Sequence, residues 1–167
     1  MFENTQITSQ LPDVSKLDFK AIDKKYLIVL VLNFLIFGAV ISIGLFFLIE
    51  ERLKEFPEYA FYFYTLVAII LMLTLVLRIF GFYKRKYAVR EHDISYKKGV
   101  LVQYVTTIPF ARIQHVELEE KPFSRFFKLA SIKIFTAGES GGDLKVHGLP
   151  KKQAKKIKEF ITHYINE

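Results

Sequence analysis

The chain contains no cysteine, and that absence excludes two classes of structure. Disulfide bonds and metal sites built on thiolates are both ruled out. The four histidines do not replace them, because none shows a metal-ligand spacing such as His-Glu-x-x-His. We therefore expect no metal and no other cofactor.

Catalytic patterns are scarce as well. The sequence has no glycine-rich phosphate loop and no close pair of carboxylates that would suggest acid–base chemistry. Residues 138–142 (GESGG) match the Gly-x-Ser-x-Gly pattern, in which Ser140 would be the nucleophile. A nucleophile elbow lies between a strand and a helix of an α/β sheet, whereas this stretch falls between two short predicted strands. We interpret it as a hairpin loop and predict no catalytic residue, with an enzyme or transporter subunit using Ser140 as the open alternative.

Charge is missing from two long runs, residues 27–49 and 59–77. A helix rises about 1.5 Å per residue, so each run is long enough to cross or nearly cross a hydrocarbon core of roughly 30 Å. Because the backbone must satisfy its own hydrogen bonds in lipid, both runs are predicted to be helices. We expect a transmembrane hairpin over residues 27–80, with spans at 27–49 and 59–79. A signal peptide or a pair of buried core helices fits less well, because the first run starts late and little other apolar surface exists to bury two helices.

The residues around these runs predict the orientation of the hairpin. Basic residues flank its outer ends, whereas the connecting residues 50–58 carry four glutamates and two basic residues. By the positive-inside rule, both termini should be cytoplasmic and the protein should be a multi-pass protein of the cell (inner) membrane. Residues 1–26 would be a cytoplasmic segment, with a short interfacial helix expected over 17–26. Within the first span, Gly38 and Ser42 form a small-xxx-small pair that predicts a helix contact, inside the hairpin or between protomers.

Beyond the hairpin, residues 81–167 change to an alternating pattern typical of strands. In the stretch QHVELE, Val116 and Leu118 are expected to point to one face and the polar residues to the other. The chain then ends in a run with helical spacing, whose apolar face includes Ala154, Ile157 and Ile161. These features predict an α+β domain of the pleckstrin-homology (PH) type, in which a C-terminal helix caps an antiparallel sheet or barrel.

One segment, IPFARIQHVELEEKPFSRFFKLASIKIFTAG, resembles the signature of YdbS-like bacterial PH membrane proteins. The residues that carry the resemblance are Ile108, Pro109, Arg112, Ile113, Gln114, Arg125, Leu129, Thr136, Ala137 and Gly138. The resemblance covers residues 25–167 and implies the same architecture, two spans before a PH-like domain, but no particular activity. Lys128 stands where the family often has glycine, which suggests a less strained backbone at that turn.

Positive charge beside the membrane is the remaining functional signal. Residues 84–167 carry seventeen basic and nine acidic residues, a net of +8. Such a surface favours anionic lipid, and nucleic acid is not expected as a partner. The residues expected at lipid headgroups or the membrane surface are Lys84, Arg85, Lys86, Lys97 and Lys98.

A second set of candidates, Arg112, Gln114 and Arg125, lies in the family-like motif. We expect the two arginines to pair with Glu117, Glu119 or Glu120, or alternatively to contact another copy or a second membrane protein. The sequence thus favours a non-enzymatic scaffold or assembly subunit on the cytoplasmic face. The alternative is a sensor of anionic lipid or of membrane state.

Overall fold

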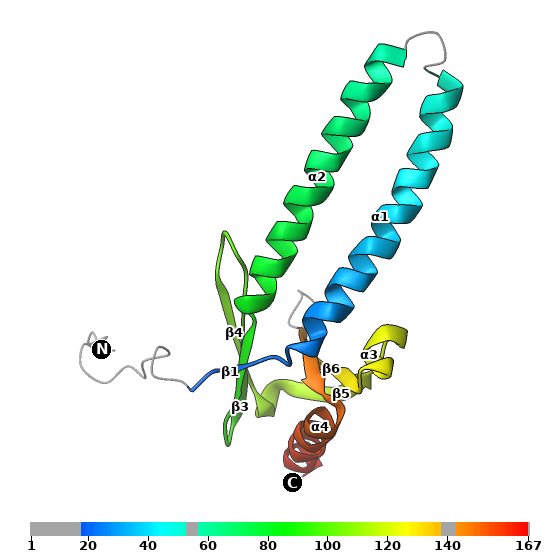
Figure 1. Ribbon diagram of the computed structural model, residues 1–167. Helices are drawn as coiled ribbons and strands as arrows, with labels where there is room; N and C mark the ends of the chain where they lie inside the picture. The colour runs from blue at the N-terminus through cyan, green and yellow to red at the C-terminus, as the bar shows by residue number, and fades with distance from the viewer. Residues whose placement is uncertain (1–17, 53–56, 138–142, 167) are drawn as a thin grey trace, which may run out of the picture.

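The computed structural model describes residues 18–52, 57–137 and 143–166. It consists of a long helical pair that rises from a small β-rich domain (Figure 1). Helices α1 (Lys25–Arg52) and α2 (Pro57–Tyr83) include both predicted spans. Only 17% and 6% of their apolar segments is buried, so they are not the core helices of a soluble protein. Each is long and apolar enough to cross a bilayer.

The two helices contact each other through a small residue. A Cβ atom on the buried Gly38 would lie 3.9 Å from a methyl group of Leu71 in α2, so Gly38 faces the neighbouring helix. A small side chain at this position lets the two backbones approach closely. Near the end of α2, the guanidinium carbon of Arg78 lies 5.8 Å from the centre of the Phe34 ring in α1.

The strands predicted between the hairpin and the C-terminal helix form two antiparallel sheets. Sheet A has the order β1-β2-β3-β4, and sheet B has the order β5-β6-β7. No closed barrel forms within the described ranges, so of the sheet and barrel alternatives the open sheets are correct. The strands of the two sheets are β1 (Lys20–Ala21), β2 (Lys86–Val89), β3 (Asp93–Lys98), β4 (Tyr104–Pro109), β5 (Ile113–Glu119), β6 (Leu129–Thr136) and β7 (Leu144–Pro150). Three short or terminal helices complete the domain: η2 (Phe110–Arg112), α3 (Pro122–Phe126) and α4 (Lys151–Asn166).

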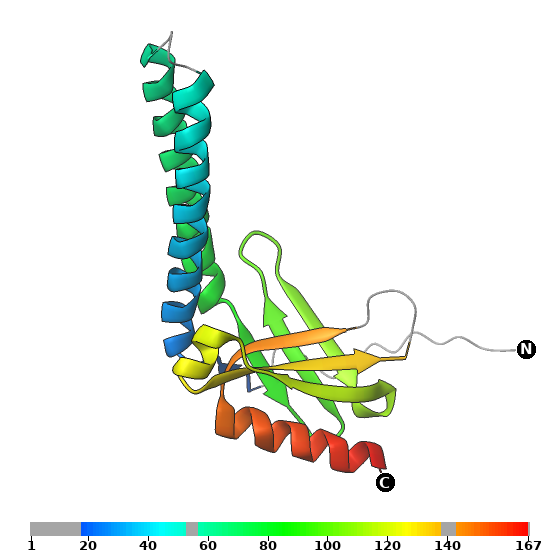
Figure 2. The same cartoon turned by 90° about the vertical axis from the view of Figure 1, so that its right-hand side faces the viewer.

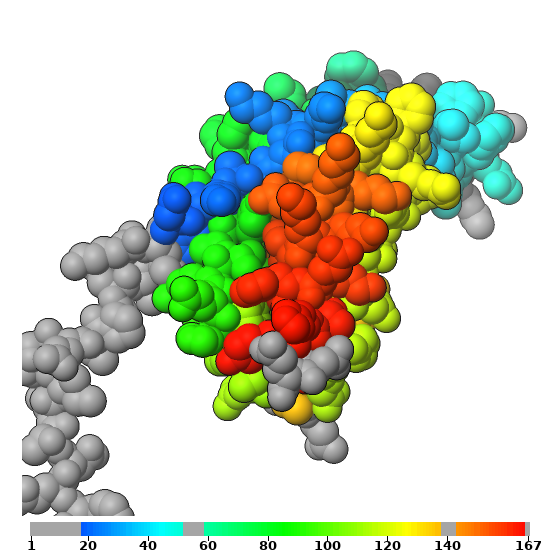
Figure 3. Space-filling view, turned by 90° about the horizontal axis from the view of Figure 1, so that it is seen from below, coloured from blue at the N-terminus to red at the C-terminus, as the bar shows by residue number. Residues whose placement is uncertain are grey.

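Helix α4 covers the side of the domain that faces away from the helical pair (Figure 2). Its predicted apolar face is confirmed, because Ala154, Ile157 and Ile161 are all buried. They pack with residues of both sheets, such as Tyr96 and Ile132, in one hydrophobic core. Seen from below, α4 occupies the centre of this face (Figure 3).

Strand β1 lies before α1 in the sequence but pairs with β2, which follows α2. The paired residues are Lys20 with Tyr87 and Ala21 with Lys86. The helical pair is therefore inserted between the first and second strands of sheet A. The expected helix over residues 17–26 is wrong for residues 18–24, because Lys20 and Ala21 pair with β2 and Ile22 enters the core with 5% exposure; Leu17 lies outside the described residues.

The turn at Lys128 also differs from expectation. Lys128 has a φ of +57°, the left-handed conformation that favours glycine. The expectation of a less strained backbone at this turn is therefore wrong. The backbone hydrogen bonds on both sides of the residue, to Arg125 and from Lys151, hold the conformation in place.

The start of α1 is attached directly to β7. The backbone N–H of Asp23 donates to the carbonyl oxygen of Gly148 at 2.8 Å. The ring of Tyr26 stacks on His147 with 6.0 Å between centroids, and it also covers Gly148. We call this contact the α1–β7 joint.

Replacing Gly148 with alanine should destabilise the protein. A Cβ atom there would lie 2.6 Å from Cγ of Tyr26, and the φ of +71° adds strain for any other residue. Overpacking and left-handed strain together suggest a loss on the order of 2 kcal/mol or more. The measurement is the thermal unfolding midpoint in mild detergent. Gly44→Ala is the control, because nothing lies within 4 Å of its Cβ position, and equal midpoints for the two variants would contradict the packing argument.

Candidate functional site: a cationic pocket at the membrane junction

A cavity of about 480 Å³ lies where α2 meets the two sheets. Its walls come from the end of α2, the hairpin between β3 and β4, and strand β7. We call it the junction pocket. The lining residues are Leu77, Arg78, Gly81, Arg85, Tyr96, Lys98, Gly99, Val100, Tyr104, Lys145 and His147.

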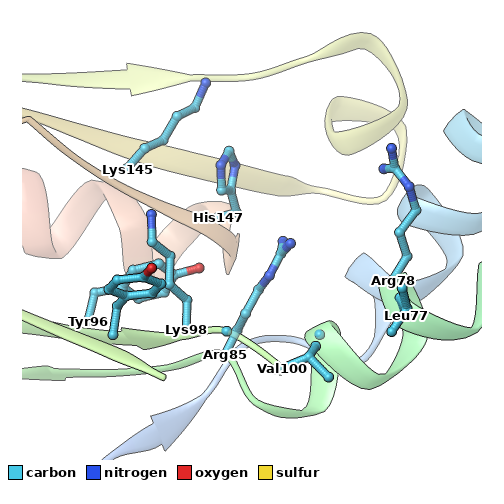
Figure 4. A pocket seen from close by; sticks show the side chains of 11 residues that line it. Leu77, Arg78, Arg85, Tyr96, Lys98, Val100, Lys145 and His147 are labelled. Carbon is cyan, nitrogen blue, oxygen red and sulfur yellow. The ribbon is translucent and has the colours of Figure 1, made fainter. Parts of the chain in front are cut away.

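The charged residues that line the pocket are all basic. Four cationic side chains line it (Arg78, Arg85, Lys98 and Lys145), and no carboxylate is among the lining residues. In Figure 4, Arg85 and Lys98 rise from one wall toward the strand that carries His147, whereas Arg78 lies apart near α1. The pocket therefore offers the charged donors of Arg85 and Lys98 from the same wall.

Arg85 is positioned by the abrupt end of α2. Its backbone N–H donates to the carbonyl of Phe82 at 3.1 Å, which closes the last turn before β2 begins. The guanidinium carbon lies 6.0 Å above the ring of Tyr26, within reach of a cation–π interaction. The α1–β7 joint thus also orients the most central arginine of the pocket.

Lys145 and His147 reach the pocket by strand alternation. They are two residues apart in β7, so they share one face, while Leu144 and Val146 are buried on the other. Lys145 forms an ion pair with Glu119 of β5. This hydrogen bond from Lys145 is the main reason that the pKa of Glu119 lies below its ordinary value. One of the four cations is therefore partly neutralised by the domain itself.

His147 is held neutral. Burial lowers its pKa from 6.5 to about 4, and the positive charges of Arg85, Lys145 and Lys121 add to the effect, while Glu119 opposes it. Ser131 lies 3.2 Å from the Nδ1 atom and fixes the ring. At neutral pH this imidazole is a hydrogen-bonding group rather than a fifth charge.

The predicted membrane-contact residues divide into two groups. Arg85 and Lys98 line the junction pocket. Lys84, Lys86 and Lys97 do not line it, and Lys86 and Lys97 are neighbours across the β2–β3 ladder. Sequence reasoning missed Lys145 and His147 as site residues, although their spacing in the stretch LKVHG already placed them on one face of a strand.

The motif residues do not form a site together. Arg112 ends η2 and Arg125 lies in α3, so the seven residues of β5 separate them by roughly 20 Å. Both arginines and Gln114 are exposed. The expected pairing of these arginines with glutamates is wrong, because the partners of Glu117, Glu119 and Glu120 are lysines, chiefly Lys133, Lys145 and Lys151.

Two other kinds of site would supply chemistry beyond binding: a metal centre and a serine nucleophile. Among the described residues, no group of three or more histidine or carboxylate side chains is placed to hold a metal ion. The Ser140 pattern lies outside the described residues. The junction pocket presents the charged donors of Arg85 and Lys98 without a carboxylate beside them in the lining, and such donors form strong hydrogen bonds with phosphate oxygens.

The fold and this surface define a membrane protein with a PH-like domain, and comparison with known proteins agrees. The model of the family "Bacterial PH domain" matches residues 27–165, and the chain belongs to that family. The chain is 30% identical over 80 residues to the UPF0699 transmembrane protein YdbS of Bacillus subtilis (strain 168). That match covers 46% of each chain, so it spans about half the length of the curated relative.

A similar solved structure is the crystal structure of a DUF1696 family protein with a pleckstrin-homology domain from Shewanella loihica PV-4. It has a TM-score of 0.38 and 18% identity, and covers 48% of this chain and 70% of that one.

The neutral state of His147 predicts a pH dependence of stability. The unfolded chain takes up a proton near pH 6.5, whereas folded His147 resists protonation down to about pH 4. The free energy of unfolding should therefore fall as pH decreases from 6.5 to 5. The lowered pKa of Glu119 acts only below this window, since its ordinary value is 4.5.

The measurement is the unfolding midpoint in mild detergent at several pH values. A His147→Gln variant removes the titrating group but keeps a polar side chain, so its midpoint should depend less on pH between 6.5 and 5. An unchanged slope in that variant would contradict the assignment.

Proposed function

We propose that this protein is a non-enzymatic, membrane-anchored PH-like module that binds the phosphate of an anionic lipid headgroup in its junction pocket. The observation that carries the proposal is the pair Arg85 and Lys98 in a cavity at the foot of the helices, with two further basic residues and no carboxylate among its lining residues. The pocket thus favours the lipid-sensor alternative over a scaffold with no ligand of its own.

The topology supports an orientation with the domain in the cytoplasm. Because β1 and β2 pair, the two ends of the helical pair meet in one sheet on one side of the membrane. A hairpin of two spans satisfies this condition. Basic residues at these ends and glutamates in the connection support an orientation with that side in the cytoplasm, in the cell (inner) membrane of a bacterium.

The position of the pocket supports lipid as the source of the anion. Arg78 and Gly81 lie in the last turns of α2, where the helix leaves its apolar stretch, so the pocket lies at headgroup height. Each basic residue near an anionic surface contributes about 1 kcal/mol. Arg85 is partly buried and so less screened, which strengthens its contribution.

A role in assembly is a second candidate, and the free edge of sheet A favours it. Strand β4 ends the sheet, and within the described residues no strand pairs with its outer side. Tyr104 and Val105 on this strand are 57% and 43% exposed. An unpaired edge of this kind can pair with a strand of another copy or of a second membrane protein. The exposed Arg112 and Gln114, which follow β4 closely in the chain, would then be polar contacts of that partner, whereas Arg125 in α3 lies on the other side of the domain.

Replacing Arg85 and Lys98 with glutamine should weaken binding of anionic lipid by about tenfold or more, from the loss of about 1 kcal/mol at each position. The measurement is native mass spectrometry of delipidated protein titrated with phosphatidylglycerol, and with phosphatidylcholine of the same acyl chains. The control is Lys152→Gln with Lys156→Gln, two exposed lysines of α4 that do not line the junction pocket.

Three outcomes are decisive. Equal losses in both double variants would mean that binding depends on net charge rather than on the pocket, and would contradict the proposal. Tight binding of glycerol phosphate without acyl chains would identify a soluble phosphate compound instead of a lipid. A discrete oligomer in the same spectra, with no preference for phosphatidylglycerol, would favour the assembly role.

A further inference from the structure

The hairpin between β3 and β4 ends in an apolar tip. Residues 99–103 read Gly-Val-Leu-Val-Gln, and we call them the hairpin tip. Leu101 is 88% exposed and Val102 is 58% exposed. The turn is tight, because a Cβ atom on Gly99 would overlap the carbonyl oxygen of Val102, and Gly99 has a φ of +111°. Two large apolar side chains are thus held outward on a constrained loop.

The hairpin tip lies beside the apolar part of α2. Val100 approaches Gly81, whose Cβ position is 3.4 Å from a Val100 methyl group, and Val100 and Leu77 line the same pocket. Figures 1 and 2 both show the β3–β4 hairpin pointing in the direction of the helices and rising past the lower end of α2. Val100 thus lies at the headgroup level of the junction pocket, and the hairpin tip continues from there alongside the apolar stretch of α2.

Residues of the β3–β4 hairpin below the tip fit a membrane boundary. Lys97 and Lys98 precede the tip, and their long side chains can extend to the headgroups while their carbon chains stay in apolar surroundings. Tyr104 follows the tip, at a level where aromatic rings are enriched in membrane proteins. The order apolar tip, then aromatic and basic residues, matches the order of layers from the acyl chains outward.

We propose that the hairpin tip inserts into the bilayer next to α2, with Leu101 and Val102 among the acyl chains. The occupant of this apolar surface is lipid, because the tip continues the lipid-facing surface of α2 at the same depth. Its insertion fixes the mouth of the junction pocket against the headgroups. The inference rests on the helices crossing the membrane, and it holds whether or not the pocket binds an anion.

The absence of cysteine makes a direct test simple. A Leu101→Cys variant of the full chain carries one labelling site, and so do a Val102→Cys variant and a Lys156→Cys control on α4. Each is labelled with an environment-sensitive fluorophore and reconstituted into phosphatidylcholine vesicles. The tip labels should show blue-shifted emission and several-fold stronger quenching by brominated acyl chains than the control, whereas iodide in the water should quench only the control strongly.

Other outcomes overturn the proposal. Strong iodide quenching at both tip positions would place the tip in water. Protection from both quenchers would mean that protein covers the tip, in which case a second copy or a partner is the occupant. Phosphatidylcholine carries no net charge, so insertion in these vesicles is independent of anion binding, and a failure here is distinct from a failure of the junction pocket.

Discussion

The attachment of both helix ends to the sheets is the constraint on which the rest of the structure depends. At one end, β1 pairs with β2 and places Ile22 in the core. At the α1–β7 joint, Asp23 donates to Gly148 and Tyr26 packs against His147. A sheet cannot shift by one residue without turning its buried side chains outward. The helical pair is therefore a fixed extension of the domain rather than a flexible tether.

Positive charge gathers in the junction pocket because the carboxylates of the domain are used elsewhere. Arginines and lysines repel one another, and a small domain with nine carboxylates beyond residue 83 has the means to pair many of them. The domain pairs its charges beside sheet B, where Glu119 forms an ion pair with Lys145 and Glu120 forms one with Lys151. At the junction pocket no carboxylate lines the wall, so Arg85 and Lys98 face a cavity that only an outside anion or water can occupy. An uncompensated cluster of this kind is stabilised by a bound anion.

The sequence predicted those parts of the fold whose residue pattern is imposed by the surrounding lipid or water. Lipid imposes uncharged runs on a spanning helix and water imposes one polar face on α4, so both were visible as patterns. Strand β1 was not, because two residues carry no periodicity and their pairing with β2 crosses sixty-odd residues of chain. Long-range strand pairing, which the sequence does not reveal, also limits what could be predicted of the site. Arg85 could be named from its place beside the span and Lys98 from its place in the first hairpin of the PH-like domain, whereas Lys145 enters only through the pairing of β7 with β6. Lysine rarely adopts the left-handed backbone conformation, but Lys128 does so because the hydrogen bonds to Arg125 and from Lys151 outweigh its intrinsic backbone preference.

The position of the pocket has a consequence for what the protein can respond to. A soluble domain that meets a membrane by diffusion must overcome the loss of its translational freedom at each encounter. Here the α1–β7 joint and the β1–β2 ladder attach the pocket to the helical pair, so under the proposed function a weak intrinsic affinity for a headgroup would suffice for occupancy. Occupancy would then depend on the composition of the surrounding leaflet rather than on recruitment. Below saturation, such a site would change its occupancy with the local abundance of anionic lipid, and for that reason the proposed function is that of a sensor rather than of an anchor.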